Sequence, residues 1–263
     1  MKFIDRKIRQ AFSNAALQYE ALTSLHKEIG RELVGRVRNM DGIKTVLDVG
    51  MGTGWLTRKL AYSFPDSKVV GLDFAPGMIE AAKKQNEGFQ IIQADACQLP
   101  FQSNAFDLIV SNLAYQWVHN QSLAFGQAYS ILKPGGRIFL TMFGHETLSE
   151  LFLSLENSLE EKDGKTALPI PIHRLATRTQ MRRVLVHAGF TELELDYEHI
   201  RVHFPDMMSL IQWTKEIGAN RLEKEIFVGK GLFLRAGQYY DQNFRDRFGI
   251  YGTFEVIWIG AKK

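Results

Sequence analysis

An acidic residue and three alternating glycines stand together near the start of the chain, and these are Asp48, Gly50, Gly52 and Gly54. They join a predicted strand over residues 45–49 to a helix predicted from about residue 55. Glycine permits positive φ and lets another molecule approach the backbone closely. The G-x-G-x-G spacing differs from the G-x-G-x-x-G of dinucleotide folds, as it would if the ligand were an amino-acid nucleoside with no pyrophosphate to hold. A tight turn without a ligand is the alternative.

A second acidic residue, Asp73, ends the next predicted strand, about 20 residues beyond the glycines, which is the usual spacing of a ribose-binding acid. Its carboxylate could accept hydrogen bonds from both hydroxyls of a ribose. The alternative is a cap for the helix predicted to begin at Pro76. We favour the ribose role.

Two further strand ends add groups that could contact the same ligand. Asp95 and Ala96 follow the third predicted strand, where the carboxylate could accept from an adenine amino group and the amide could contact a ring nitrogen. Phe74 and Met78 could enclose the base, although both residue types are equally common in a core. Asn112 ends the fourth strand, and its backbone carbonyl could hold an ammonium group.

Alternating strands and helices position these residues. The strands are predicted in TVLDV, SKVVGLD, FQIIQADA, FDLIVSNLA and RIFLTMF, with helices between most of them. This alternation indicates a parallel α/β sheet. Ligands of such sheets bind at the carboxyl ends of the strands, where all the residues above stand.

The remaining segments predict additions to this sheet. Residues 1–42 predict a helical arm, in which Leu25, Ile29, Leu33 and Val37 share one face and Ser24 is the predicted N-cap. Residues 43–145 form the predicted cofactor-binding core. Residues 146–250 predict helices and one alternating strand, in an insertion that could form a lid, and 251–263 predict the last strand. We expect a single domain over 1–263.

Composition restricts the class of protein. The chain has 263 residues, with 32 basic and 29 acidic side chains and a net charge of +3, too few excess cations for a general nucleic-acid binder. Mean hydropathy is −0.15, and no apolar run is long enough to cross a bilayer. The first residues lack the apolar core of a secretory signal. The single cysteine, Cys97, excludes an intrachain disulfide, which favours a cytoplasmic location. We also expect a monomer without membrane contact.

With these motifs the chain resembles the class I S-adenosylmethionine-dependent methyltransferases. The matching stretches are VLDVGMGTG, VVGLDFAPGMI, IIQADACQLPF, FDLIVSNLAYQWV and LKPGGRIFLTMF. The resemblance implies a Rossmann-like, seven-stranded, mostly parallel sheet with an antiparallel last strand, which TFEVIWIGAK would supply. It also implies S-adenosyl-L-methionine as the cofactor, at Asp48, Gly50, Gly52, Asp73, Asp95, Ala96 and Asn112.

A narrower resemblance covers nearly the whole chain. FSNAALQYE, SNLAYQWV and YYDQNF…YGTFEVIW look like the malonyl-acyl-carrier-protein O-methyltransferases of biotin biosynthesis. This implies a malonyl thioester on an acyl carrier protein as the substrate and partner, with malonyl coenzyme A as a variant. Four residues are candidates for the acceptor site, namely Tyr19, Gln116, Trp117 and His145. Trp117 and Tyr19 could equally be core residues, and Gln116 could cap the following helix.

Esterification of a carboxylate needs little side-chain chemistry. A carboxylate is ionised at neutral pH, so no general base and no metal is expected. Transfer from a sulfonium to a carboxylate cancels charge, which a water-poor pocket favours. The protein is left to position the reactants. Arg201 and Arg221 are candidates for holding the malonyl carboxylate, and most histidines are expected to be structural or solvated.

An acidic carrier protein predicts a basic docking surface. One candidate set surrounds a predicted helix and comprises Arg174, Arg178, Arg182 and Arg183. A looser set comprises Lys215, Arg221, Lys224, Lys230 and Arg235. The alternatives for function are a small-molecule methyltransferase of the trans-aconitate or quinone-precursor type, because SNLAYQW also resembles the former, and a non-catalytic cofactor-binding module.

Overall fold

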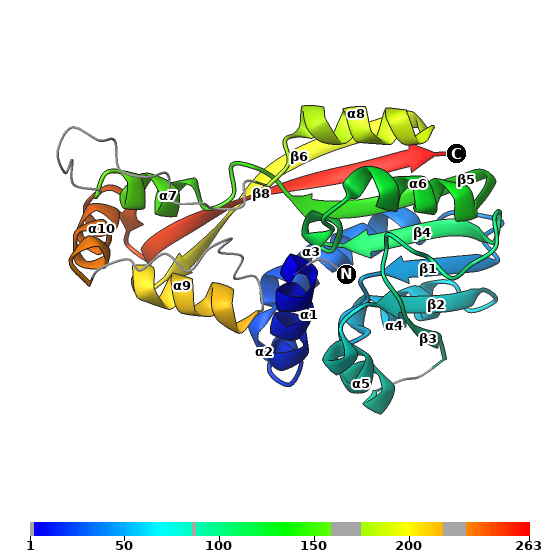
Figure 1. Cartoon of the computed structure of the whole chain (residues 1–263), viewed down its shortest axis with the longest axis horizontal. Helices are drawn as coiled ribbons and strands as arrows, with labels where there is room; N and C mark the ends of the chain where they lie inside the picture. The colour runs from blue at the N-terminus through cyan, green and yellow to red at the C-terminus, as the bar shows by residue number, and fades with distance from the viewer. Residues whose placement is uncertain (1–2, 86–87, 159–174, 218–229) are drawn as a thin grey trace.

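The computed structural model describes residues 3–85, 88–158, 175–217 and 230–263, and its main feature is one mixed sheet (Figure 1). The strands are β1 (Thr45–Val49), β2 (Lys68–Asp73), β3 (Gln90–Gln93), β4 (Phe106–Asn112), β5 (Leu132–Phe143), β6 (Thr191–Phe204), β7 (Arg245–Asp246) and β8 (Gly249–Lys262). Their order is β3-β2-β1-β4-β5-β8-β6, with β7 paired to β8. The predicted seven-stranded sheet is confirmed, and β7 adds a short hairpin to it.

Strand direction follows the prediction. Strands β1 to β5 are mutually parallel where they pair, whereas β8 is antiparallel to both β5 and β6. The strands β1 and β4 are almost wholly buried, as expected for strands covered on both faces. Pro134 and Gly135 were predicted to end a helix, but α6 already ends at Ile131 and both residues lie in β5, at a register shift opposite β4.

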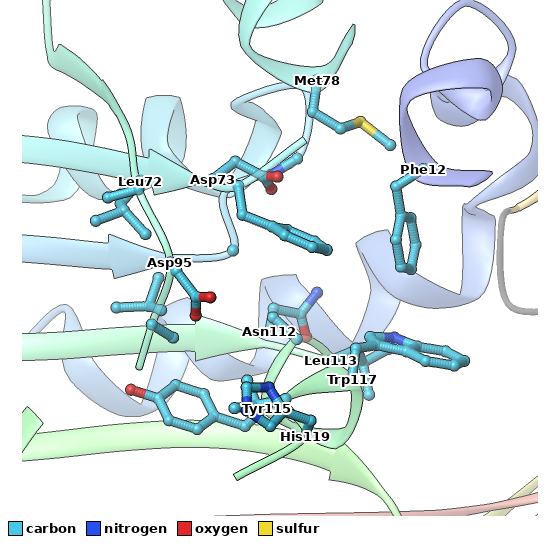
Figure 2. A pocket seen from close by; sticks show the side chains of 18 of the residues that line it. Phe12, Leu72, Asp73, Met78, Asp95, Asn112, Leu113, Tyr115, Trp117 and His119 are labelled. Carbon is cyan, nitrogen blue, oxygen red and sulfur yellow. The ribbon is translucent and has the colours of Figure 1, made fainter. Parts of the chain in front are cut away.

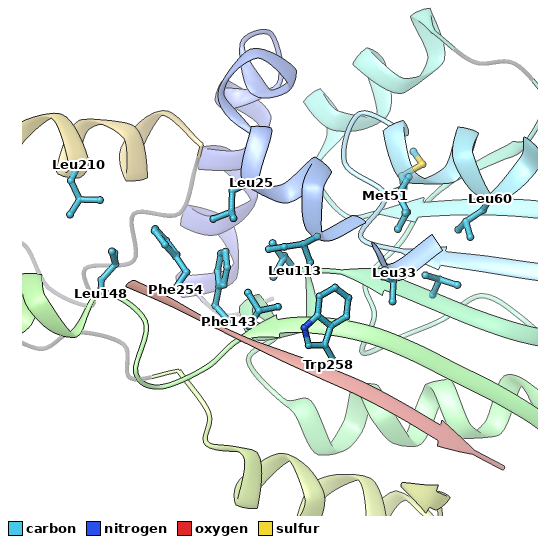
Figure 3. Packing of buried hydrophobic residues seen from close by; sticks show 14 of the residues in the cluster. Leu25, Leu33, Met51, Leu60, Leu113, Phe143, Leu148, Leu210, Phe254 and Trp258 are labelled. Atoms are coloured by element: carbon cyan, nitrogen blue, oxygen red, sulfur yellow. The ribbon is translucent and has the colours of Figure 1, made fainter. Parts of the chain in front are cut away.

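Helices cover both faces of the sheet. On one face are α3 (Ser24–Val37), α4 (Trp55–Ser63) and α5 (Pro76–Lys84), and on the other are α6 (Gln121–Ile131) and α8 (Arg178–Ala188). Each face has its own apolar layer. The α3 and α4 layer continues past Phe143 and Phe254 to Leu210 at the far end of the sheet (Figure 3). Burial of this continuous layer holds the two ends of the molecule together.

The N-terminal arm is helical as predicted. It consists of α1 (Phe3–Ala15), α2 (Tyr19–Leu22) and α3, and the four predicted face residues of α3 are buried. The predicted cap at Ser24 is wrong, because α3 begins at Ser24 and Thr23 precedes it. The Thr23 hydroxyl donates instead to the Tyr19 carbonyl oxygen, at 2.7 Å. Helix α1 packs on α5, where a Cβ at Gly77 would lie 2.4 Å from the Ser13 carbonyl oxygen.

The long strands β6 and β8 carry a second group of helices beyond the core. These are α7 (Ser149–Glu156), α9 (Met207–Glu216) and α10 (Lys230–Asn243), at the left of Figure 1. Helix α8 is followed by Gly189, whose φ of 102° is the left-handed conformation that glycine adopts readily. The final strand begins at Gly249 rather than 251. Residues 162–174, KDGKTALPIPIHR, lie outside the described residues. Among the residues described, no helix is long and apolar enough to span a membrane.

Candidate functional site

The main cavity opens at the carboxyl ends of β1, β2 and β4, beneath α1 and α2. Its space, together with the open solvent at its mouth, is about 790 Å³, which is wide enough for a small molecule. Asp73 and Asp95 lie at neighbouring strand ends, and Phe12 and Trp117 stand on the opposite side (Figure 2). Of the other predicted cofactor and acceptor residues, the lining includes Tyr19, Gly50, Gly52, Phe74, Met78, Ala96 and Asn112. Asp48, Gly54, Gln116 and His145 are not part of it.

The glycine-rich turn has the conformation that its sequence requires. Gly50 has φ of 77°, and a Cβ there would lie 2.2 Å from the Cβ of Ala114. Gly52 has φ of 55°, and its N–H donates to Asp73 Oδ2 at 2.9 Å. Side chains at these positions would be strained and would occupy the cavity wall.

Asp73 links the turn to β2. Its Oδ2 accepts the Gly52 N–H and its Oδ1 accepts the Ala75 N–H at 2.8 Å, while only 7% of the residue is exposed. Burial raises the pKa of Asp73 to about 6, although these backbone N–H groups oppose the shift. The N-cap position of α5 is Ala75, so the alternative role of Asp73 as that cap is not observed.

Asp48 lies below the cavity floor. It is fully buried, its Oδ2 accepts the Thr57 hydroxyl at 2.6 Å, and its Oδ1 has no hydrogen-bond partner among the described residues. Burial raises its pKa to about 7; the hydrogen bond from Thr57 opposes this shift and the charge of Asp73 adds to it. Asp48 therefore links β1 to α4 and does not face the cavity. Gly54 stands in the left-handed conformation at the N-cap of α4.

The third strand end supplies a mixed polar and apolar wall. Asp95 Oδ1 accepts the Cys97 N–H at 2.8 Å, which holds the carboxylate at the cavity beside Ala96. Met78 is buried and Phe74 is half-buried, and both line the cavity. These residues thus line the cavity together, and their contacts with an adenine ring stay a prediction.

Asn112 performs a structural task with its side chain. Its Nδ2 donates to the His26 carbonyl oxygen at 2.9 Å, and its Oδ1 accepts the Thr141 hydroxyl at 2.7 Å. The amide thus ties α3 to β4 and β5. The next residue, Leu113, has φ of 53°, so the chain turns sharply at the end of β4. The backbone carbonyl of Asn112 remains the group predicted to face a ligand.

The arm supplies the outer wall. Tyr19 and Trp117 are half-buried cavity residues rather than core residues, and the Trp117 ring meets Phe12 edge-on at 5.6 Å. Burial, together with the charge of Asp73, raises the pKa of Tyr19 far above its ordinary value. Its hydroxyl therefore stays protonated and can donate a hydrogen bond.

Two predicted acceptor residues lie elsewhere. Gln116 is 2% exposed and its Oε1 accepts the Phe143 N–H at 3.3 Å, so it braces the turn after β4 instead of facing a cavity. It does not cap α6 either, because Asn120 does. His145 is exposed, lines neither cavity, and gathers with Glu146 and Glu255.

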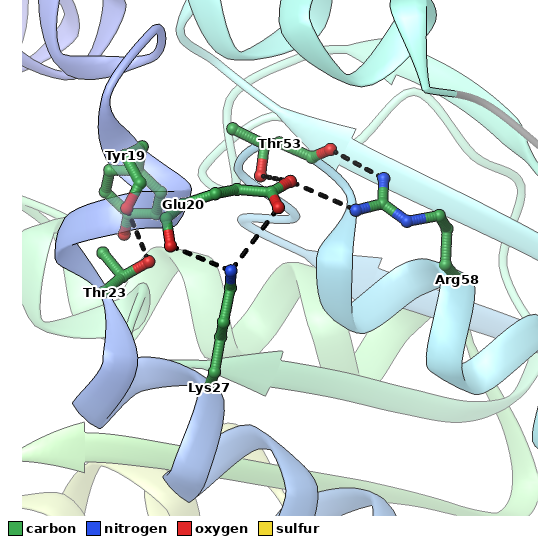
Figure 4. A network of polar contacts seen from close by, with 6 residues as sticks. All are labelled: Tyr19, Glu20, Thr23, Lys27, Thr53 and Arg58. Atoms are coloured by element: carbon green, nitrogen blue, oxygen red, sulfur yellow. Dashed lines mark hydrogen bonds and ion pairs between the residues drawn. The ribbon is translucent and has the colours of Figure 1, made fainter.

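A second, smaller cavity adjoins the first and shares Tyr19, Gly50, Gly52 and Asn112 with it. Glu20 stands at its edge in a polar cluster (Figure 4). The carboxylate accepts from the Thr53 hydroxyl at 3.0 Å and from Arg58 at 3.1 Å, and lies 3.4 Å from Lys27 Nζ. Burial raises the pKa of Glu20, but the Thr53 hydrogen bond and the two cations outweigh it and lower the pKa. The cluster fastens the arm to the glycine-rich turn.

Among the lining residues that were not predicted from sequence, Phe12, Glu20 and His26 bear most on the site. Phe12 and Glu20 are the first and last residues of the FSNAALQYE motif, so the motif contained them but did not reveal their contacts. His26 gives no local signal, since it stands within an ordinary amphipathic helix. Arg201, a predicted carboxylate ligand, lies over the Tyr251 ring at 4.4 Å and lines neither cavity, and Arg221 lies outside the described residues.

The order of strands, the antiparallel β8 and a nucleoside-sized cavity at the strand ends define a Rossmann-like methyltransferase fold. Comparison with known proteins agrees. The family described as "Methyltransferase domain" matches residues 47–140. A Bacillus halodurans protein assigned as a methyltransferase shares the fold, with a TM-score of 0.61 and 22% identity over 89% of this chain and 98% of that one.

Sequence relatives extend over nearly the full length. The malonyl-[acyl-carrier protein] O-methyltransferase of Gallionella capsiferriformans is 31% identical, covering 99% of this chain and 91% of the relative. The enzyme of that name from Hahella chejuensis is also 31% identical, covering 95% and 88%. The chain belongs to the class I S-adenosylmethionine-dependent methyltransferases, and its cofactor is S-adenosyl-L-methionine.

Proposed function

We propose that this protein transfers a methyl group to the free carboxylate of a malonyl thioester carried by acyl carrier protein. The main support is the extent of the similarity. The relatives that carry this activity in their names match the arm, the far helices and β8 as well as the shared domain at 47–140. Because acceptor sites in this architecture are built outside the shared sheet, similarity there bears on the substrate.

The cavity residues suit the cofactor. We assign the ribose to the Asp73 carboxylate, the adenine to Asp95 and the Ala96 amide, and the cover of the base to Phe74 and Met78. The amino-acid end would lie over the turn of Gly50 and Gly52, near the Asn112 carbonyl and Tyr19. An anionic, apolar-walled cavity is appropriate for a cationic nucleoside. When bound, S-adenosyl-L-methionine supplies an electrophilic methyl group on a sulfonium.

Positioning and water exclusion are the tasks left to the protein. The acceptor carboxylate is already ionised, so no residue has to remove a proton. Phe12, Tyr19 and Trp117 wall the cavity with rings, which lowers the local dielectric where opposite charges meet. The Glu20 cluster holds this wall against the glycine-rich turn and α4. We assign no residue to acid–base catalysis.

Docking of an acidic carrier is proposed at α8. Arg182 and Arg183 are exposed neighbours on this helix and are available to a partner. Arg178 is less available, because its guanidinium stacks on Tyr197 at 3.5 Å and lies 3.7 Å from Glu255. Arg174, Arg221 and Lys224 lie outside the described residues. We further propose a cytoplasmic location, which suits a chain with a single cysteine.

The test is intact-mass analysis of malonyl-acyl carrier protein after incubation with the purified protein and cofactor. We expect one added methyl group that an esterase removes. Parallel reactions with malonyl coenzyme A, free malonate, trans-aconitate and a quinone-precursor phenol define the alternatives. Methyl transfer detected only on a free acid or a phenol would replace the proposal with the small-molecule function, which the SNLAYQW motif supports.

A further inference from the structure

His26 lies where three parts of the molecule meet. Its ring contacts Tyr19 of α2 at 6.0 Å, Phe143 at the end of β5 at 5.9 Å, and Trp213 of α9 at 6.5 Å between centroids. It also lines the second cavity, together with Tyr19 and Asn112. The ring therefore stands between the cofactor cavity and helix α9 of the far group.

The environment of the ring determines which nitrogen carries the proton. His26 Nδ1 is buried and has no hydrogen-bond partner among the described atoms. A neutral imidazole has one N–H donor and one acceptor, and burying an N–H without an acceptor is rare in proteins. We therefore assign the proton to Nε2, which leaves a donor for the cavity. Burial lowers the pKa of His26 to about 4, so the ring is neutral at physiological pH.

The cavity offers an anion few alternatives. No arginine is among the residues found to line either cavity, and Lys27 is the one lysine in the second. Lys27 Nζ is engaged, since it donates to the Glu20 carbonyl oxygen at 2.9 Å and pairs with the Glu20 carboxylate. Tyr19 and His26 are thus two neighbouring neutral donors at this point.

We propose that His26 Nε2–H, beside the Tyr19 hydroxyl, binds the acceptor carboxylate and orients it toward the methyl group. The inference rests on the proposed carboxylate methylation and adds the residue that recognises the acceptor. A neutral donor suits this task better than a cation. It holds an anion without cancelling the charge that makes the oxygen nucleophilic, and without repelling the neighbouring sulfonium.

The experiment compares His26→Gln with His26→Met, two side chains of similar size that differ in the donor. We expect His26→Met to raise KM for malonyl-acyl carrier protein and lower kcat/KM by about tenfold or more, as loss of a hydrogen bond to a charged group predicts. His26→Gln should recover most of that loss, because its amide can donate. In both variants the Kd for S-adenosylhomocysteine, measured by calorimetry, should change less than about twofold. His203→Met is the matched control on exposed β6.

The outcomes separate the possible roles. Equal loss in both variants, with unchanged thermal unfolding, would show that only ring packing matters and would overturn the proposal. A weakened Kd for S-adenosylhomocysteine that accounts for the lost kcat/KM would reassign His26 to the cofactor's own carboxylate. A wild-type protein that methylates no carboxylate would overturn the proposed function, and the role of His26 with it, before any variant is compared.

Discussion

The two walls of the cavity are built differently. The inner wall comes from strand ends and their turns, and its carboxylates are held by backbone N–H groups, as Asp73 is held by Gly52 and Ala75. The outer wall comes from the arm and the turn after β4. It is held by side chains, through ring contacts such as Phe12 with Trp117 and through the Glu20 cluster.

Because of this difference, we expect a rigid inner wall and an outer wall that can open to admit ligands. Backbone hydrogen bonds within a sheet and its turns form with the fold itself, so the inner wall is organised before any ligand binds. Partly exposed ion pairs contribute little each, so the outer wall can open at small cost in free energy. The inner wall should therefore control affinity for the cofactor, and the outer wall should control entry and closure.

The largest expected effect is at the inner wall. Asp73→Ala should weaken S-adenosylhomocysteine binding by about 1.5–3 kcal/mol, roughly 10- to 100-fold, because charge-assisted hydrogen bonds to the ribose are lost. Calorimetry measures the change, and Asp66→Ala, on an exposed loop, is the control. An unchanged Kd in a folded Asp73→Ala variant would refute the ribose role.

Acid should weaken the same contact. With a pKa of about 6, Asp73 is ionised at pH 8 and largely protonated at pH 5. Protonation removes acceptor capacity, so affinity for S-adenosylhomocysteine should fall as pH decreases through 6, approaching about tenfold per pH unit. Titration calorimetry across this range should show a flatter profile for Asp73→Asn. A profile that stays steep in that variant would point to Asp48 instead.

Reversal of charge on α8 should leave the inner wall intact. The double substitution Arg182→Glu and Arg183→Glu should raise KM for malonyl-acyl carrier protein about threefold to tenfold at low salt, with less effect at high salt. Affinity for S-adenosylhomocysteine should not change. Steady-state kinetics at two ionic strengths tests this, and unaltered kinetics would remove α8 from the docking surface.

The smallest expected effect is at the clamp of the outer wall. Glu20→Gln removes the charge that Arg58 and Lys27 share, and partly exposed pairs of this kind contribute about 0.2–1 kcal/mol. Cofactor affinity should fall no more than about fivefold, while hydrogen exchange in α1 and α2 accelerates. Glu28→Gln, on the exposed side of α3, is the control. Unchanged exchange in the arm would mean that apolar packing alone holds it.

The strands of the sheet and the residues of the inner wall could be predicted from the sequence alone. Strand β1 and the start of α4 lie where they were predicted, because alternating apolar segments and a glycine-rich turn are local requirements of backbone and burial. Asp73, Asp95 and Asn112 were predicted to converge because parallel strands bring their carboxyl ends to one edge. Beyond that rule, no information on distant contacts is needed to predict the inner wall.

The long-range contacts that build the outer wall could be found only in the folded structure. The Asn112 amide bonds to the backbone of His26, 86 residues earlier, and Trp213 Nε1 donates to the Leu22 carbonyl oxygen, 191 residues earlier. Gln116 and His145 stand at suitable places in the sequence, yet they line neither cavity. Periodicity gives the face of a helix or strand but not which distant side chains meet it. Packing between the arm, β5 and α9 supplies that information, because many weak contacts form together only in the folded chain.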